Sequence, residues 1–169
     1  MTELSIQRRA PWHIRNRFVV LLLLTLAAGA FRFATLDRPP LWGDEALTYS
    51  RVIGSFADLL DILRYDGFMP LHYEIYWWLQ HGLPIDLHHQ LAPHLVLTPK
   101  VMRIVPALCG TLMVPAMYFA AVQIASRRAA LLAAAFAAVS AYLMGYSHDA
   151  KMYIQTWLFV TLNLGCCWW

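Results

Sequence analysis

Four apolar stretches dominate the hydrophobic pattern of this chain, and each approaches the length of a membrane span. A helix needs roughly 20 predominantly apolar residues to cross the hydrocarbon core of a bilayer. We therefore predict an all-α integral membrane protein, the N-terminal part of a multi-span helical bundle. Its predicted spans are residues 18–36, 102–125, 129–146 and 152–169.

The segment between the first two spans, residues 37–101, has helical patterns of its own. Ser55-Phe-Ala-Asp58 resembles a capping box with Asp in the place of Glu, and apolar residues at helical spacing follow it. This pattern predicts an amphipathic helix at about 55–65 that lies along the membrane surface. Residues 70–83 (PLHYEIYWWLQHGL) are too few and too polar for a span, and their Tyr and Trp suit the headgroup level. They predict an interfacial or partly re-entrant helix.

The arginines predict which side each loop faces, because Lys and Arg near span ends favour the cytoplasm. They cluster before the first span (Arg8, Arg9, Arg15 and Arg17) and between the second and third (Arg127 and Arg128). Residues 1–17 and 126–128 are therefore expected in the cytoplasm, and the loops 37–101 and 147–151 on the opposite face. A further span at 70–83 would put Arg127 and Arg128 outside. We place the protein in the plasma (inner) membrane, with its N-terminus in the cytoplasm.

Composition agrees with a membrane protein and narrows its partners. Of the 169 residues, 60% are hydrophobic and only 14% charged, whereas a soluble domain carries about a quarter charged residues. No basic run interleaved with aromatic residues suggests nucleic acid. Ala28-Gly29-Ala30 could end a cleaved signal peptide, although the apolar run continues to Leu36. Since the sequence stops inside an apolar run, we expect the natural chain to continue and this part alone to be inactive.

The acid pair Asp44-Glu45 in WGDEA is the first candidate for chemistry. One interpretation is an acidic helix start, which the positive N-terminal end of a helix favours. The other is a functional site, because Asp149 lies in the second outer loop and the predicted topology brings it to the same face. Convergent ionisable residues at a membrane boundary indicate function by default.

Two arginines inside the predicted spans each have two interpretations. Arg32 lies near the outer end of the first span, and Arg103 begins the apolar part of the second. Either side chain could extend to the headgroups and keep its charge in water. Either could instead face the bundle and contact an anionic group.

These features occur in an order that resembles a known family. An arginine in the first span is followed by the proline-rich approach to WGDEA, by DGFMPLHYEIYWWL, and by RIVPALCGTLMVPAMYF with SHDAKMY further on. The chain resembles, over residues 30–160, the N-terminal region of the glycosyltransferase C superfamily (GT-C). The similar branch is bacterial and close to protein O-mannosyltransferases (dolichyl-phosphate-mannose-protein mannosyltransferases) and aminoarabinose transferases. The chain departs from it with Met69-Pro70 in place of two prolines, and with HDAK in place of a Gln-Glu-Ala-Arg run.

The resemblance implies an enzyme that takes a sugar from a polyprenyl-phosphate donor on the extracytoplasmic face. Asp44 would be the base, Glu45 would support it, and Asp149 would complete the site. A divalent metal ion, if one takes part, would bind these three acids. Substrate contacts are assigned to Arg32, Arg103, His148, Lys151 and Tyr153. Lys151 replaces an arginine and so lacks the two-pronged guanidinium that suits phosphate.

The chemistry explains why one dominant carboxylate would be enough. A glycosidase needs a second carboxyl group to protonate its alkoxide leaving group. A polyprenyl phosphate leaves as a stabilised anion, so the reaction needs a base for the acceptor and cations for the phosphate. The expected course is an inverting displacement. The alternative is a non-catalytic membrane protein, such as part of a transporter or an assembly subunit, which uses the acidic loops to bind a partner.

Overall fold

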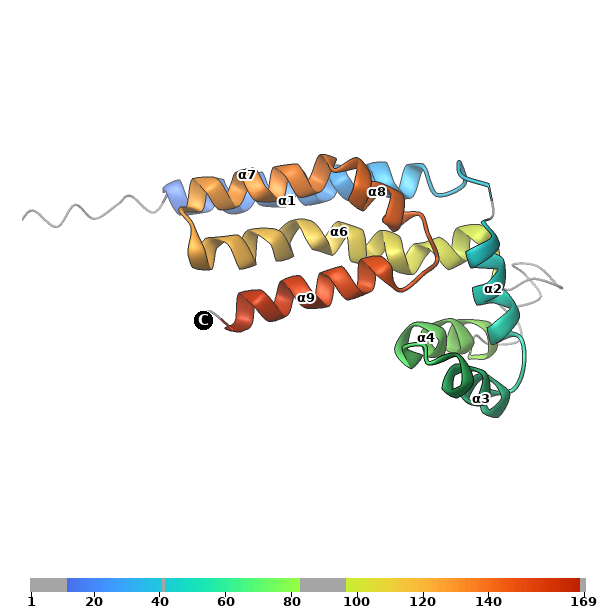
Figure 1. Cartoon of the computed structure of the whole chain (residues 1–169). Coiled ribbons are helices and arrows are strands. Elements are labelled where there is room, and N and C mark those ends of the chain that lie inside the picture. Colours follow the sequence, from blue (N-terminus) through green and yellow to red (C-terminus); the bar gives the residue numbers. More distant parts are fainter. Residues whose placement is uncertain (1–11, 41, 83–96, 168–169) are drawn as a thin grey trace, which may run out of the picture.

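The computed structural model describes residues 12–40, 42–82 and 97–167, and its regular elements within these ranges are all α-helices. Arg8 and Arg9 and most of the segment 84–100 fall outside them. In these ranges four helices pack lengthwise into a bundle, a short helix continues one of them after a bend, and three more gather at one end of the bundle (Figure 1). The helices are α1 (Trp12–Ala34), α2 (Gly43–Val52), α3 (Phe56–Asp66), α4 (Pro70–His81), α6 (Pro99–Ile124), α7 (Arg127–Val139), α8 (Ala141–Ser147) and α9 (Tyr153–Cys167).

Among the described residues, two helices are long and apolar enough to cross a membrane, which agrees with the membrane character expected from the sequence. They are Asn16–Ala34 within α1 and the whole of α6. Residues Arg127–Val139 and Ala141–Ser147 form a third span only if α7 and α8, which meet at 54°, are counted together. The described part of α9 has 15 residues, so the fourth span stays a prediction.

The bend between α7 and α8 is the main departure from the predicted spans. The run 129–146 gives no sign of it, yet Ser140 leaves the helical conformation with φ −62° and ψ 115°. Its hydroxyl then accepts a hydrogen bond from the backbone N–H of Leu143 (3.3 Å), which caps the start of α8. On the other side of the bend, Nη2 of Arg32 donates to the carbonyl of Ala137 (3.4 Å), in the last turn of α7.

Arg32 faces the bundle and does not extend to the headgroups. The side chain is fully buried. Its Nε donates to Oγ of Ser147 (3.1 Å) and its Nη1 to the carbonyl of Ala28 (3.1 Å). Its partners are neutral oxygens, and no carboxylate in the described ranges pairs with it. Arg32 thus joins α1 to both halves of the bent segment.

The helices α2, α3 and α4 form a small unit beside the bundle. Arg51 of α2 is central to it, because it pairs with Asp66, donates to the hydroxyl of Tyr73 (2.9 Å) and lies over the ring of Phe68 (4.6 Å). The unit is attached to α6 by Tyr76, whose hydroxyl donates to the carbonyl at the start of that helix. Its core is apolar and buried.

Both short helices predicted in the first loop are confirmed. Ser55 and Asp58 form the predicted capping box, since Oγ of Ser55 accepts from the N–H of Asp58 (3.2 Å) and Oδ2 of Asp58 accepts from the N–H of Ser55 (3.1 Å). Helix α3 ends at Gly67, whose φ of 68° suits glycine. Helix α4 begins at Pro70, which provides a fixed φ for the first helical position.

Gly110 allows α6 to approach Arg32 and α8 closely, and substitution there tests this packing. A Cβ at Gly110 would lie 1.9 Å from Oγ of Ser147 and 3.1 Å from Nε of Arg32. We expect Gly110→Ala to lower the free energy of unfolding by about 1–3 kcal/mol through overpacking. Thermal unfolding in detergent measures the effect.

The matched control is Gly145→Ala in α8, where an added Cβ meets no atom within 4 Å. This variant should be neutral, or more stable by up to about 1 kcal/mol, because alanine favours a helix over glycine. Equal destabilisation by the two substitutions would contradict the packing described for Gly110.

Candidate functional site

The candidate site begins with a buried ion pair between α2 and α6. Nε of Arg103 donates to Oε1 of Glu45 (2.8 Å), and Nη2 donates to Oε2 (2.6 Å). The Arg103 side chain is 1% exposed and that of Glu45 is 0% exposed. Two parallel charge-assisted hydrogen bonds fix both the distance and the orientation of the two groups.

The remaining donors of Arg103 bind the chain that leads from α1 to α2. Its Nη1 donates to the carbonyls of Leu36 (2.9 Å) and Pro39 (2.8 Å), and its Nη2 also donates to that of Pro40 (2.8 Å). A guanidinium has five N–H groups, and all five are now used. Arg103 therefore neither extends to the headgroups nor has a donor left for a substrate phosphate. The substrate contact assigned to it from the sequence does not fit this geometry.

Glu45 also joins the two predicted outer loops. Its Oε1 accepts from the backbone N–H of Ala150 (3.2 Å), and Oγ1 of Thr48, one turn along α2, donates to the carbonyl of Ala150 (3.2 Å). His72 of α4 lies against the same carbonyl through Nε2 (3.2 Å). The predicted meeting of the acid pair with the second loop is therefore present, at one end of the bundle.

His72 holds this loop as a neutral ring. Burial lowers its pKa to about 4, and the positive charge of Lys151 acts in the same direction. At neutral pH the ring has one N–H group, which donates a hydrogen bond to one partner. Nδ1 lies 3.0 Å from Oε1 of Gln155 at the start of α9. His72 thus connects α4, the loop and α9, which is a structural task.

The adjacent acids of WGDEA separate because successive residues of a helix point about 100° apart. Glu45 faces inward to Arg103, whereas Asp44 is exposed. The helix-start interpretation is confirmed, because both acids lie in the first turn of α2. The functional interpretation stays a prediction, and it now concerns the exposed Asp44. Glu45 uses its oxygens within the protein, so its support for Asp44 is positional.

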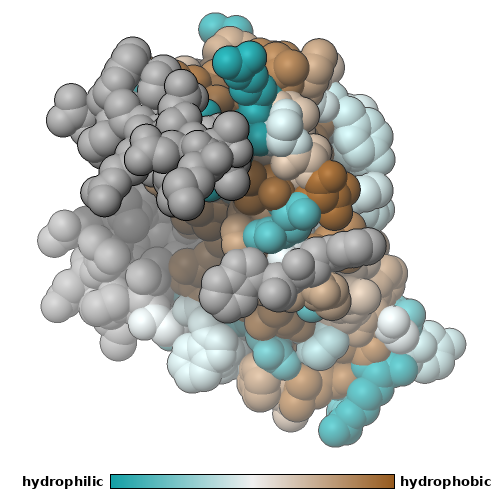
Figure 2. Space-filling model, turned by 90° about the vertical axis from the view of Figure 1, so that its left-hand side faces the viewer, coloured by the Kyte–Doolittle hydropathy of each residue, from teal (hydrophilic) through white to brown (hydrophobic). Residues whose placement is uncertain are grey.

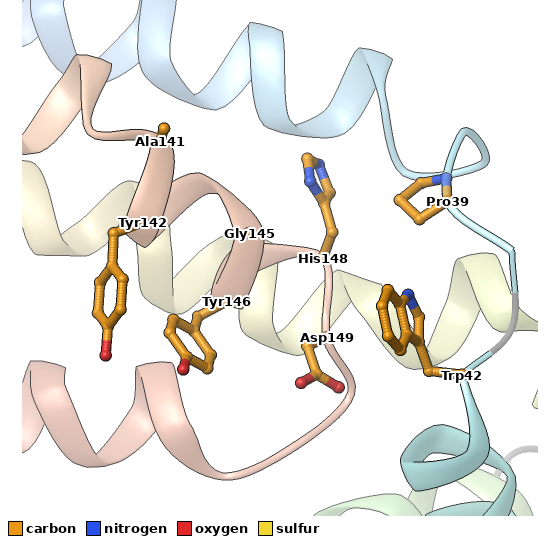
Figure 3. Close-up of a pocket in the computed structure, with 8 residues that line it drawn as sticks. All are labelled: Pro39, Trp42, Ala141, Tyr142, Gly145, Tyr146, His148 and Asp149. Atoms are coloured by element: carbon orange, nitrogen blue, oxygen red, sulfur yellow. The ribbon is translucent and has the colours of Figure 1, made fainter.

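A pocket of about 450 Å³ lies between helix α8 and the segment that leads into α2. Its walls are mostly apolar, with Trp42 on one side and Tyr142 and Tyr146 on the other (Figure 3). Asp149 lies between Tyr146 and Trp42 in this view, and it is the acidic residue of the lining. Flat aromatic faces beside a carboxylate suit a ligand with both apolar and hydroxyl surfaces.

Asp149 is the most perturbed acid of the site. Its pKa is raised from 3.8 to about 6, first because the carboxyl group is buried and then because Glu45 and Asp44 are negative. The positive charges of Lys151 and Arg103 oppose this increase. Its Oδ1 is buried and has no hydrogen-bond partner among the described residues. A half-buried carboxyl group that titrates near neutral pH suits proton transfer.

Lys151 provides positive charge near Asp44 and Asp149. Its side chain is 4% exposed, and burial lowers its pKa, while Asp44 and Asp149 raise it. No side-chain hydrogen bond or ion pair of Lys151 occurs within the described ranges. Its positive charge is therefore not committed to a side-chain partner there.

The other residues predicted to bind substrate take different positions. His148 points away from Asp149 toward α1 (Figure 3), and its Nε2 lies 3.0 Å from the carbonyl of Arg32. Tyr153 begins α9, and its ring packs against that of Tyr146 at 5.2 Å. Tyr153 therefore extends the aromatic wall of the pocket, whereas Arg32 is confined to the bundle.

The acids Asp44, Glu45 and Asp149 are not arranged as the metal site that they would form if a metal ion took part. Glu45 is fully committed to Arg103 and to backbone N–H groups, so it offers no free oxygen. Where residues are described, no group of three or more His, Cys, Asp or Glu is arranged to hold a metal ion.

No protein-family model matches the chain, and neither a curated protein nor a solved structure does so.

Glu45→Gln tests the buried ion pair. The variant leaves the charge of Arg103 buried without its counter-ion, so we expect the free energy of unfolding to fall by about 3–5 kcal/mol. Chemical unfolding in detergent measures the loss.

The matched control is Lys100→Gln, which removes the ion pair between Lys100 and Asp37. The two side chains of this pair are 60% and 65% exposed. Such a pair contributes at most about 1 kcal/mol. If both variants lost the same stability, the Glu45–Arg103 pair would not be the anchor described here.

Asp149→Asn tests the raised pKa. A carboxyl group with a higher pKa in the folded than in the unfolded state binds protons preferentially when folded, so stability falls as the pH rises from about 4 to about 6. The variant should be more stable than the wild type at pH 7.5, by roughly 1 kcal/mol because the group is half exposed to screening solvent. Thermal unfolding at pH 4 and pH 7.5 measures this difference.

The gain should shrink toward zero at pH 4, where the wild-type carboxyl group is largely protonated. Asp61→Asn, which removes an exposed acid on α3, should show no such pH-dependent gain. A wild type more stable than Asp149→Asn at pH 7.5 would contradict the raised pKa.

Proposed function

We propose that this protein is a membrane glycosyltransferase that transfers a sugar from a polyprenyl-phosphate donor to an acceptor at the extracytoplasmic face. The observation that supports it most is that Asp44, Asp149 and Lys151 lie close enough to influence one another's charge, and that Asp149 lines an aromatic pocket. The proposal also rests on the resemblance of WGDEA and its surroundings to the GT-C superfamily.

In the proposed reaction, Asp44 is the base. It is exposed, and it belongs to a helix fixed by the Glu45–Arg103 pair, so it can accept the proton of an acceptor hydroxyl or amine. The acceptor atom forms a bond to the anomeric carbon while the bond from that carbon to the phosphate oxygen breaks. The polyprenyl phosphate departs with the electron pair, and the configuration inverts.

Lys151 has the chemistry to stabilise the departing phosphate. An ammonium group in a partly dehydrated site interacts more strongly with a developing negative charge than it would in water. Burial lowers the pKa of Lys151, and the nearby acids keep it charged by raising it. Lysine acts here as a point charge without the fork of an arginine.

The pocket offers a place for the sugar. Trp42 is 63% exposed and borders the same pocket as Tyr146 and Asp149. Its apolar ring face can pack on the C–H face of a sugar, while Asp149 accepts or donates a hydrogen bond at a hydroxyl. A lipid-linked donor presents its sugar-phosphate at the headgroup level, where a site at the end of membrane-crossing helices can meet it.

Asp44→Asn tests the proposed base. The substitution keeps the shape but removes the basic oxygen, so transfer should fall by a factor of about 10²–10⁴ or more. The measurement uses membranes that contain the complete gene product, incubated with radiolabelled polyprenyl-phosphate sugars, and follows loss of label from the donor lipid.

Asp37→Asn is the matched control, because Asp37 is an exposed acid before α2 that pairs with Lys100. It should retain near wild-type transfer, and both variants should reach wild-type levels in the membrane. Normal turnover by Asp44→Asn would remove Asp44 as the base. No transfer by the wild type from any polyprenyl-phosphate sugar would favour the partner-binding alternative.

A further inference from the structure

A second pocket lies at the opposite end of the bundle and is independent of the proposed transferase site. It has a volume of about 760 Å³ and lies where α1 begins and where α6 turns into α7. Its charged lining consists of Arg17 from α1 with Arg127 and Arg128 from α7. Figure 2 views this end of the molecule, where hydrophilic side chains stand among hydrophobic ones.

The pocket carries positive charge that no described residue neutralises with an ion pair. None of the three arginines forms an ion pair or a side-chain hydrogen bond within the described ranges. The acids in those ranges lie at residues 37–74 and at 149, around the other end of the bundle. Three guanidinium groups that converge from two helices therefore present their N–H donors to an outside anion.

The start of α7 adds to this preference. Oγ of Ser126 accepts a hydrogen bond from the N–H of Ala129 (3.3 Å), which caps one free N–H of the first turn. The neighbouring N–H groups of Arg127 and Arg128 belong to the same first turn, at the positive end of the helix. Backbone and side chains thus favour the same sign of ligand.

The position of the pocket determines where its anion comes from. Phe18, which follows Arg17, is 62% exposed, and Ile124, at the end of α6, is 71% exposed. Both belong to helices that are long and apolar enough to cross a membrane. Exposed apolar side chains that directly adjoin pocket residues in the sequence suit a molecule with both acyl chains and a phosphate. Free phosphate would use only the arginines.

We propose that this pocket binds the phosphate of an anionic phospholipid headgroup. The phosphate oxygens accept hydrogen bonds from Arg17, Arg127 and Arg128, and the acyl chains lie along Phe18 and Ile124. Helices α1, α6 and α7 would be held together at this end by the bound lipid, as Arg32 and Arg103 hold them toward the other end.

The test measures lipid retention by the whole chain purified in detergent. Native mass spectrometry counts bound phosphatidylglycerol and phosphatidylcholine, and titration gives the apparent affinity for each. The wild type should prefer phosphatidylglycerol. The triple variant Arg17→Gln, Arg127→Gln, Arg128→Gln should bind it roughly a hundredfold more weakly, because each arginine near an anionic lipid adds to the attraction.

A matched control removes three cations from the other end of the molecule: Arg38→Gln, Arg64→Gln, Lys100→Gln. Its affinity for phosphatidylglycerol should stay within about threefold of the wild type, since these exposed side chains lie outside the pocket. Single substitutions of Arg17 and Arg127, each expected to weaken binding several-fold, test the site if the triple variant does not fold.

Three outcomes would overturn the proposal. The first is equal loss of phosphatidylglycerol by the two triple variants, which would indicate a general charge effect. The second is equal binding of phosphatidylglycerol and phosphatidylcholine by the wild type. The third is full displacement of the lipid by millimolar inorganic phosphate, which would indicate an anion site that does not use the acyl chains.

Discussion

The ion pair between Glu45 and Arg103 is the constraint on which the candidate site depends. Removing two charges from water is costly, and a buried pair often adds little net stability compared with apolar residues. Its effect here is geometric, because the same two side chains bind the approach to α2, helix α6 and the backbone at Ala150. Without it, the loop that carries Asp149 would be held relative to α2 only by Thr48 and His72, which contact the carbonyl of Ala150.

The pair also divides the work between two neighbouring acids. Glu45 neutralises a buried arginine, which leaves Asp44 as a solvent-accessible carboxylate on a rigid helix. The same negative charges raise the pKa of Asp149. The ion pair and the protonation of Asp149 are therefore coupled. A change at Glu45 alters both a contact that positions the loop and the negative charge that raises the pKa of Asp149.

Local sequence patterns predicted the local structure well. The capping box at Ser55 and the proline at the start of α4 act within one helical turn, so a reader of the sequence can recognise them. The bend at Ser140 could not be predicted from local patterns. It is accompanied by a hydrogen bond from Arg32 to the carbonyl of Ala137, and these two residues are 105 positions apart in the sequence. The ion pair was missed for a similar reason, although opposite charges predicted at one membrane boundary were a signal for it. The anchoring of Ala150 uses backbone atoms and leaves no trace in side-chain patterns.

The positively charged side chains at the two ends of the bundle differ in whether a carboxylate already pairs with them. Around the candidate site, Arg51, Lys100 and Arg103 are each paired with a carboxylate. Lys151 is buried near Asp44 and Asp149 without such a pair in the described ranges. The arginines at the other end have no ion pair among the residues that the structure describes, and they are more exposed, which suits the lipid site proposed there. Within the described ranges, the bundle thus has a buried lysine without an ion pair where catalysis is proposed, and arginines that are more exposed where lipid binding is proposed.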